Sequence, residues 1–400
     1  MRKLLAAVGC LTAALTCLDT PIESRPAGPV GSTEIRWDEY GVPHISASTV
    51  AGASYAFGWA QMESHGDLLL EDYARARGRA AEYFGPSWRE SDRWVLTNDI
   101  PSRAEQWLEQ QTPEFRGLLE SFAAGINAYG HDHADTLSAT HRAVLPVRAA
   151  DILAHVQHAV HFTFIANRDR IVRSAETAPP AGSNGWAIAP KYATSHHAML
   201  LINPHLPWAG VYRLTEAHVR VDKVIDVYGA TFVGFPVIGM GFNEKLGWTH
   251  TVNTFDGADL FRLTLEGDGY RWGESVRPLE RVTHTLRVRA ADGSVTSETF
   301  DTDHSIHGPI IAKQGGTAIA LRVSGLDRPR LLEEWWDMAR AGDTDAFERV
   351  IRRLDLPIFT ILSADRGGHI LSVFGGLTPK RASESYPWAG IVPGQTPATL

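Results

Sequence analysis

The sequence predicts an α+β protein, in which a helical first part precedes a strand-rich second part. Apolar residues recur at spacings of three and four in the first part, whereas short apolar runs bounded by glycine and proline fill the second. A polar, proline-rich stretch over residues 173–182 lies between them and has the composition of a linker. With 44% hydrophobic and 21% charged residues, the chain has the composition of a globular protein.

The N-terminus has the pattern of an export signal. Arg2 and Lys3 precede an apolar run over residues 4–18 that is too short to span a bilayer, and polar residues follow it. We therefore expect residues 1–20 to be a signal peptide and the protein to be exported, either periplasmic or secreted, with no membrane span.

Both cysteines lie inside this expected signal peptide. Because Cys10 and Cys17 would be removed with it, the mature chain would contain neither a disulfide nor a catalytic cysteine. The sequence ALTC before residue 18 is a poor match to a lipid-attachment site, which argues against lipidation at Cys17.

The first part is expected to contain a strand region and three helices. They are predicted at residues 32–47, 49–81, 115–126 and 151–162. The third helix carries His155, His158 and His161 on one face. Three histidines without a nearby carboxylate usually pack or face solvent, and the alternative is a metal-dependent hydrolase built on this face.

The second part is expected to contain mainly strands. They are predicted at residues 186–189, 198–202, 224–228, 232–239 and 260–265. One helix is predicted over residues 331–354, and residues 359–376 have the pattern of a hairpin that turns at Gly367-Gly368.

Charge and motifs exclude several classes of protein. A formal net charge of −8 without a Lys/Arg-rich block argues against nucleic acid as a partner. The sequence contains no P-loop, no H-E-x-x-H and no G-x-S-x-G. The run that begins at Gly267 has Trp272 where a dinucleotide fingerprint needs glycine.

Several motifs occur together and in order. The second part contains GSNGWAIAP, NPHLPWAG, DVYGATFVGFPVIGMGFNEKLGWTHTVN and HGPIIA, and the first part contains WDEYGVPHISA, GRAAEYFG and AAGINAYG. From about residue 34 onward the chain thereby resembles the penicillin acylase family of N-terminal nucleophile hydrolases. Within that family it most resembles the acyl-homoserine lactone acylase and aculeacin acylase branch.

The resemblance implies an αββα sandwich with a helical first subunit wrapped on it. It implies cleavage into a small subunit over residues 25–174, a spacer over residues 175–182 and the N-terminal part of a large subunit over residues 183–400. The family's large subunit extends further, so we expect a sandwich that is incomplete at the C-terminus.

Ser183 is the expected nucleophile. In the family the chain cuts itself before this residue, here at Gly182–Ser183, and the freed α-amine becomes the base of its own serine. An α-amine ordinarily has a pKa of about 7.7–8.0, so it can accept the hydroxyl proton near neutral pH. The resemblance further implies that His205, in INPHLPW, hydrogen-bonds near the amine and orients it; the alternative is a loop histidine satisfied by backbone.

The expected oxyanion donor is the backbone N–H of Val252, in THTVN. The family's second donor is an asparagine side chain beyond the segment that resembles WAGIVPG, and this chain ends at Leu400 without it. Losing one such donor costs about 100- to 1000-fold in turnover. Asn253 is adjacent to Val252, but no pattern directs its side chain into the site.

An acyl-chain pocket is expected from the same resemblance. Leu206, Phe232 and Phe235 fall where the lactone-acylase branch lines its cavity, and Trp208 either walls the pocket or braces its loop. Plain core packing is the alternative for each residue. Two phenylalanines at these positions shorten the pocket and favour short or medium acyl chains.

No cofactor is required by this chemistry, and calcium is the one candidate ion. The stretch DGAD, with Asp256, the Ala258 carbonyl and Asp259, resembles the calcium-binding segment of penicillin acylases, and Glu176 is a further candidate ligand. Several members of the lactone-acylase branch lack the ion, so both states remain open.

The expected function is hydrolysis of a small-molecule N-acyl amide of the acyl-homoserine lactone, penicillin or lipopeptide type. The working form would be a heterodimer of the two cleaved subunits. The alternative, motivated by the expected truncation and its open strand edges, is an inactive remnant of such an acylase.

Overall fold

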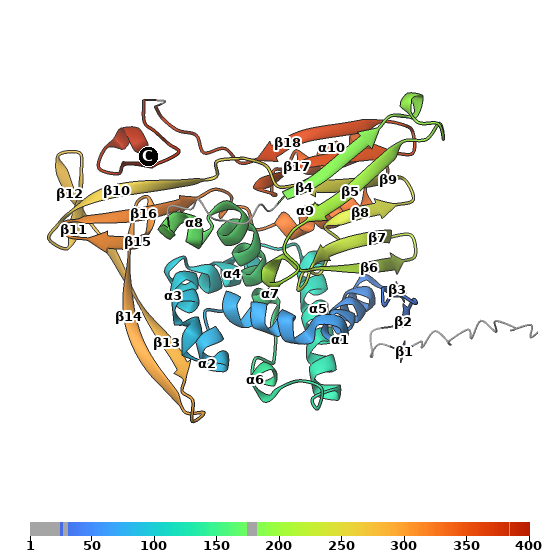
Figure 1. Ribbon diagram of the computed structural model, residues 1–400, viewed down its shortest axis with the longest axis horizontal. Coiled ribbons are helices and arrows are strands. Elements are labelled where there is room, and N and C mark those ends of the chain that lie inside the picture. The colour runs from blue at the N-terminus through green and yellow to red at the C-terminus, as the bar shows by residue number, and fades with distance from the viewer. Residues whose placement is uncertain (1–24, 27–30, 174–181, 384) are drawn as a thin grey trace, which may run out of the picture.

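The computed structural model describes residues 25–26, 31–173, 182–383 and 385–400 (Figure 1). The expected signal peptide, the spacer up to residue 181 and Glu176 lie outside the described residues. Within the described ranges, each helix is too short or too polar to cross a lipid bilayer.

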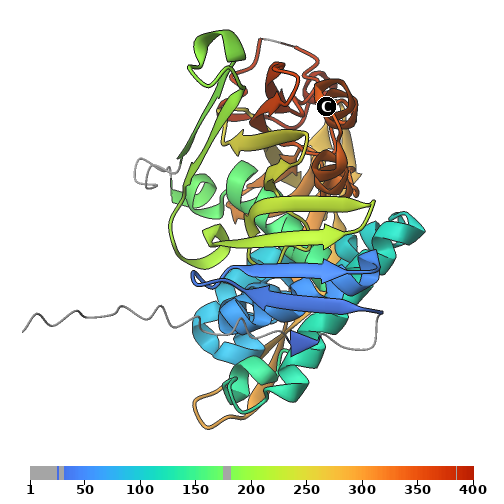
Figure 2. The same cartoon turned by 90° about the vertical axis from the view of Figure 1, so that its right-hand side faces the viewer.

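Strands from both parts of the chain form one nine-stranded sheet. In sheet order they are β1 (Arg25–Pro26), β2 (Thr33–Trp37), β3 (Pro43–Ala47), β6 (Leu214–Val221), β7 (Ile225–Phe232), β8 (Met240–Asn243), β9 (Leu246–Thr251), β17 (Ile358–Asp365) and β18 (Ile370–Gly376). Neighbours are antiparallel except β3 and β6, which pair in parallel. Figure 2 shows the blue strands of the first part continuing the sheet of the second. The expected small subunit is therefore not only helical.

Helices cover one face of this sheet. They are α1 (Val50–Ala76), which contacts β2, β3 and β6, α9 (Leu331–Arg340), which contacts β7 and β8, and α10 (Thr344–Ile351), which contacts β17. On β6 the residues Ala217, Val219 and Val221 alternate toward this face and are buried.

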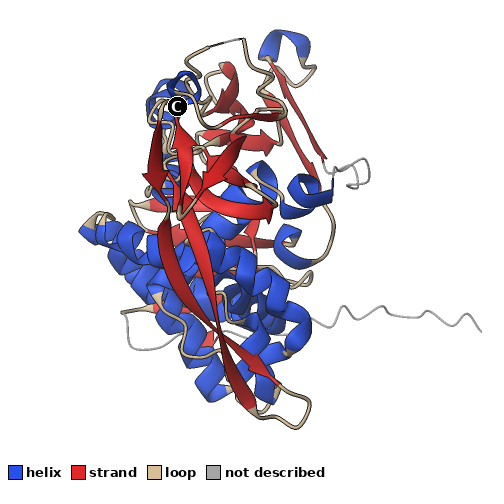
Figure 3. Cartoon of the chain, turned by 90° about the vertical axis from the view of Figure 1, so that its left-hand side faces the viewer, coloured by secondary structure: helices blue, strands red, loops and turns tan. Residues whose placement is uncertain are grey.

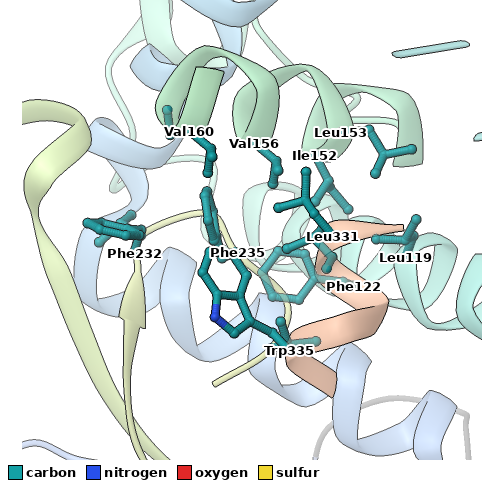
Figure 4. Packing of buried hydrophobic residues seen from close by; sticks show 14 of the residues in the cluster. Leu119, Phe122, Ile152, Leu153, Val156, Val160, Phe232, Phe235, Leu331 and Trp335 are labelled. Atoms are coloured by element: carbon teal, nitrogen blue, oxygen red, sulfur yellow. The ribbon is translucent and has the colours of Figure 1, made fainter. Parts of the chain in front are cut away.

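The first part contains further helices, most of which contact α1. They are α2 (Ala80–Phe84), α3 (Arg89–Thr97), α4 (Ile100–Glu109), α5 (Pro113–Asp132), α6 (Ala139–Arg142), α7 (Ala149–Val156) and α8 (Arg168–Arg173). Figure 4 shows Phe122 of α5 and Val156 of α7 in one cluster with Leu331 and Trp335 of α9. The two parts of the chain thus share one apolar core.

A two-stranded hairpin forms a second β layer on the other face of the sheet. Its strands are β4 (Gly182–Ile188) and β5 (Met199–His205). A Cβ added at Gly185 would lie 3.0 Å from Thr249 Cγ2 and 3.3 Å from Leu362 Cδ1, so the hairpin packs directly on β9 and β17. The helix, sheet and hairpin layers form an α+β sandwich and correspond to three of the four layers of the expected αββα arrangement, which was expected to be incomplete.

A second sheet extends from the sandwich and forms the arm in Figure 3. Its path is β12 (Ser275–Pro278), β11 (Gly269–Trp272), β10 (Ala258–Glu266), β16 (Thr317–Val323), β15 (Gly308–Gln314), β14 (Val295–Ser305) and β13 (Glu280–Arg289), with β19 (Ile391–Pro393) beside β10. The long β13–β14 pair reaches back to the first part, where β13 contacts α2 and α3.

Three predicted elements are wrong in their extent. The helix expected over residues 49–81 ends at Ala76, because Gly78 has φ 65°, and α2 begins only at Ala80. The strand expected over residues 232–239 is a buried loop after Phe232, because Gly234 has φ 86° and Pro236 cannot donate to a ladder. The helix expected over residues 331–354 is two helices, since Ala341 is extended and the Asp343 carboxylate caps α10 by accepting from the Ala346 N–H at 2.7 Å.

Glu334 in α9 makes stability depend on pH. It is 1% exposed, and its carboxylate accepts a hydrogen bond from the Asp355 N–H at 2.7 Å. Burial raises the pKa of Glu334 to about 8, above the unfolded value of about 4.3. The folded state therefore holds this proton more tightly, and its contribution to stability, present below pH 4, is lost as pH rises toward 8.

Replacing Glu334 with glutamine should remove this loss. The free energy of unfolding of Glu334→Gln, measured relative to wild type, is expected to be higher at pH 9 than at pH 5. The change between the two pH values should be on the order of 4 kcal/mol. Thermal unfolding at both pH values measures it, with Asp337→Asn on the same helix as the control. An equal difference for the two variants would contradict the assignment.

Candidate active site

An apolar cavity opens beside Ser183. Its empty volume, including the mouth, is about 420 Å³. It is lined by Phe164, Ser183, Pro204, Leu206, Thr231, Phe232, Gly239, Met240, His250, Val252, Trp335 and Phe359. These residues come from the hairpin, the large sheet, α9 and the segment after α7, so the cavity lies where the layers meet.

Gly182 and Ser183 begin β4 rather than forming a turn. Gly182 pairs with His205 and Ser183 with Pro204 across the hairpin. The Ser183 hydroxyl donates to the Gly182 carbonyl oxygen at 2.7 Å. The hydroxyl is thereby held at the peptide bond that the resemblance marks for cleavage.

His205 lies against this peptide bond and not in the cavity. A Cβ added at Gly182 would be only 2.7 Å from His205 Nε2, so a larger residue at position 182 would displace the imidazole. The ring is exposed, and its Nδ1 is 3.4 Å from the Asn203 Oδ1. This position is compatible with the orienting role expected for His205.

Val252 follows the end of β9 and lines the cavity with Ser183. Its backbone N–H has no hydrogen-bond partner among the described residues. Asn253 turns away, because its Nδ2 donates to the Gly375 carbonyl at 2.7 Å. None of the described residues that line the cavity carries a side-chain amide.

The four expected pocket residues divide into two pairs. Leu206 and Phe232 line the cavity. Phe235 does not; it is fully buried and packs against Phe232, with ring centroids 5.4 Å apart. Figure 4 shows the two side chains beside each other. Trp208 is 86% exposed and outside the lining, because it lies on the loop after β5.

His250 and Trp335 form a wall of the cavity that the sequence did not reveal. The Trp335 Nε1–H donates to His250 Nε2 at 2.8 Å, so the ring proton is on Nδ1. Burial lowers the pKa of His250 to about 4, which keeps the ring neutral. His250 is two residues before Val252, but nothing local predicts its partner 85 residues away.

The histidines of the third predicted helix are core residues. His155, His158 and His161 are buried, and burial lowers the pKa of each. His155 packs between Tyr73 and Phe235. The described part of the chain contains no group of three or more His, Cys, Asp or Glu that could hold a metal ion. A metal-dependent hydrolase therefore finds no support on this helix.

The expected calcium segment is already neutralised by an arginine. Arg381 Nη2 donates to Asp256 Oδ2 at 2.7 Å and to Asp259 Oδ1 at 2.8 Å, while Ala258 begins β10. Calcium takes six to eight oxygen ligands, and this set offers two carboxylates that both bind a guanidinium. The described donors do not fit a calcium ion.

Removing this guanidinium should destabilise the protein. Arg381→Met takes the hydrogen-bonded guanidinium from the carboxylate of Asp259, which is 2% exposed, and leaves, among the described residues, only Arg322 on the neighbouring strand as a cation near it. We expect a loss of up to about 3–5 kcal/mol. Chemical denaturation measures it, with the exposed Arg262→Met on the same strand as control. Adding calcium to chelator-treated wild type should leave its stability unchanged, and a gain in stability on adding calcium would contradict the arrangement.

The three layers, with a serine at the start of the hairpin and a cavity beneath it, are those of an N-terminal nucleophile hydrolase fold. A family model for penicillin amidase matches residues 32–399. The chain belongs to the penicillin amidase family.

Known relatives agree in sequence over most of the chain. It is 30% identical to an acyl-homoserine lactone acylase, PvdQ, of Pseudomonas fluorescens (strain Pf0-1), covering 90% of this chain and 52% of the relative. It is 27% identical to the aculeacin-A acylase of Actinoplanes utahensis, covering 90% and 51%. The chain therefore spans about half the length of the curated relatives it matches.

Among solved structures, a thermostable penicillin G acylase from Alcaligenes faecalis matches with a TM-score of 0.47 and 19% identity. The match covers 53% of this chain and 38% of that one.

Proposed function

We propose that this protein is an exported amide hydrolase that removes the acyl group from a small N-acyl compound. Its nucleophile would be Ser183, freed by cleavage of the Gly182–Ser183 bond. The observation that carries the proposal is the position of the Ser183 hydroxyl, which touches the Gly182 carbonyl and lines an apolar cavity.

Self-cleavage would proceed by acyl transfer within the chain. Ser183 Oγ adds to the Gly182 carbonyl carbon, the C–N bond to Ser183 breaks, and the acyl group moves to Oγ as an ester while the amine takes a proton. Water then hydrolyses the ester and leaves a carboxylate at Gly182 and a free α-amine on Ser183. The adjacent His205 imidazole is positioned to exchange protons during these steps.

Turnover would use the same serine with its new amine. The α-amine accepts the hydroxyl proton as Oγ attacks the substrate carbonyl, and the Val252 N–H donates to the developing oxyanion. The leaving amine departs with a proton, and water hydrolyses the acyl ester to a carboxylate. Because an α-amine ordinarily has a pKa of about 7.7–8.0, activity should rise with pH through that range.

The cavity favours an apolar acyl group of short or medium length. Its walls are mainly aromatic or aliphatic, and the bulky rings of Phe232, Trp335 and Phe359 are among them. An acyl chain of an acyl-homoserine lactone, the phenylacetyl group of a penicillin or the acyl tail of a lipopeptide each meets this chemistry.

The two cleaved subunits would remain associated as a heterodimer. Two sets of contacts join the subunits. β3 of the first subunit pairs in parallel with β6 of the second, and α5 and α7 of the first share a core with α9 of the second. Neither contact depends on the Gly182–Ser183 bond.

An inactive remnant of such an acylase is the second candidate. The observation in its favour is that the described cavity lining supplies no side-chain amide as a second oxyanion donor. By itself that loss would lower turnover about 100- to 1000-fold.

A panel of acyl-homoserine lactones of increasing chain length, together with phenylacetyl amides, separates the two candidates. The proposal expects hydrolysis of at least one compound, with release of the free acid and a preference for short or medium chains. If the cleaved, folded protein hydrolyses none of them, the remnant is correct.

A further inference from the structure

Two histidines face each other on the side of the large sheet opposite α1. His44 in β3 and His218 in β6 are directly paired in parallel register, so their side chains stand side by side. Their Nδ1 atoms are 3.1 Å apart. The side chains are 37% and 31% exposed, so an ion from solvent can reach them.

A carboxylate fixes the outer nitrogen of each ring. His218 Nε2 is 2.8 Å from Asp226 Oδ1, and His44 Nε2 is 3.4 Å from Asp38 Oδ2. Asp38 is itself held, because its Oδ1 accepts from the N–H groups of Tyr40 and Val42 at 2.9 Å. An ionised carboxylate only accepts hydrogen bonds, so each Nε2 carries a proton.

This arrangement leaves a lone pair on each Nδ1 that has no hydrogen-bond donor. With both rings neutral and protonated at Nε2, two acceptors face each other at 3.1 Å, and no hydrogen bond forms between them. A cation between the two nitrogens resolves the conflict. Around the pair, the acidic residues Asp38, Asp226, Glu216 and Glu34 outnumber the basic residues Arg220 and Arg36, so the local field is negative.

We propose that His44 and His218 form a binding site for a divalent late transition-metal ion such as zinc. Zinc–imidazole bonds are about 2.0–2.1 Å long, so two nitrogens on one ion are roughly 2.9 Å apart at a right angle and roughly 3.3 Å apart at the tetrahedral angle. The observed 3.1 Å lies between these values. In such sites a metal-bound histidine usually donates its other ring N–H to a carboxylate, and each of these two histidines has a carboxylate at its Nε2.

The protein supplies two ligands, and water completes the coordination. The described residues provide no third His, Cys, Asp or Glu at this point, so we expect an exchangeable ion of modest affinity. His44 precedes the Gly182–Ser183 bond and His218 follows it. The ion would therefore join two elements that cleavage separates in sequence, although the site itself does not depend on cleavage.

Zinc titration of the full chain, first stripped with chelator, tests the site. By calorimetry, wild type should bind one more zinc ion than His44→Gln or His218→Gln. Excess zinc should also raise the Tm of wild type by about 2–5 °C more than it raises the Tm of either variant. Asp226→Asn should weaken this site about 10- to 100-fold. His197→Gln, in an exposed turn, should match wild type.

Equal zinc stoichiometry in wild type and both variants would overturn the proposal. A folded wild type that binds no zinc at millimolar concentration would also overturn it. In that case the short distance between the two Nδ1 atoms would be explained by a shared proton. If the variants do not fold, modification of wild-type histidines by diethyl pyrocarbonate decides: zinc should protect His44 and His218 but not His197, and identical labelling with and without zinc would refute the site.

Discussion

Ser183→Ala is expected to abolish both cleavage and hydrolysis. The variant loses the atom positioned to add to the Gly182 carbonyl, since the Ser183 hydroxyl is the group held 2.7 Å from that carbonyl oxygen. The chain should stay intact across residues 182 and 183. Amide hydrolysis should fall by roughly a thousandfold or more, as expected when a nucleophile is removed.

Two controls separate chemistry from folding. Ser183→Cys keeps a nucleophile at the same place and should still cleave, whereas Ser195→Ala, in the exposed β4–β5 connection, should behave as wild type. The Ser183→Ala chain should keep the wild-type circular dichroism spectrum. Cleavage of a folded Ser183→Ala chain at the wild-type bond would show that another group performs the reaction.

Phe232→Ala should shift the preference toward longer acyl chains. Phe232 forms a wall of the cavity, so removing its ring adds room where the acyl group is expected to lie. Each additional methylene that finds an apolar contact should improve kcat/KM by about tenfold. The cost in stability should be about 3–5 kcal/mol, because the ring is also packed against Phe164 and Phe235.

Phe235→Ala is the matched control. Phe235 packs against Phe232, outside the lining, and is fully buried, so its loss should cost a similar stability without removing a wall of the cavity. Denaturant unfolding and kcat/KM across a series of chain lengths measure both effects. If the two variants shift the preference equally, Phe232 does not set the depth of the pocket.

Strong local periodicity made much of the fold predictable. The hairpin over residues 359–376 and the helix around Phe122 have one apolar face each and lie where they were expected. The β13–β14 arm was missed because β13 offers only a few apolar residues on its buried face, and Thr296 to Thr299 of β14 are polar and exposed. The break between α9 and α10 was missed because only residues 341–343 separate the two helices: Ala341 ends the first and Asp343 caps the second.

The candidate site was predictable only in part. Family motifs placed Ser183, Val252, Leu206 and Phe232 in sequence, and the structure brings these four around one cavity. Trp335 reaches the same cavity from α9, and such a long-range contact leaves no local pattern. Arg381 likewise lies 122 residues from Asp259, so its ion pair could not be read from the DGAD motif.

The central claim is that the chain is cut before Ser183 and that this residue then acts as the nucleophile. Intact-mass spectrometry combined with N-terminal sequencing of the purified wild-type protein tests it most directly. We predict two co-purifying chains, the second of which begins Ser-Asn-Gly-Trp. A folded wild-type protein that remains one chain across Gly182 and Ser183, or that is cut at a different bond, would contradict it.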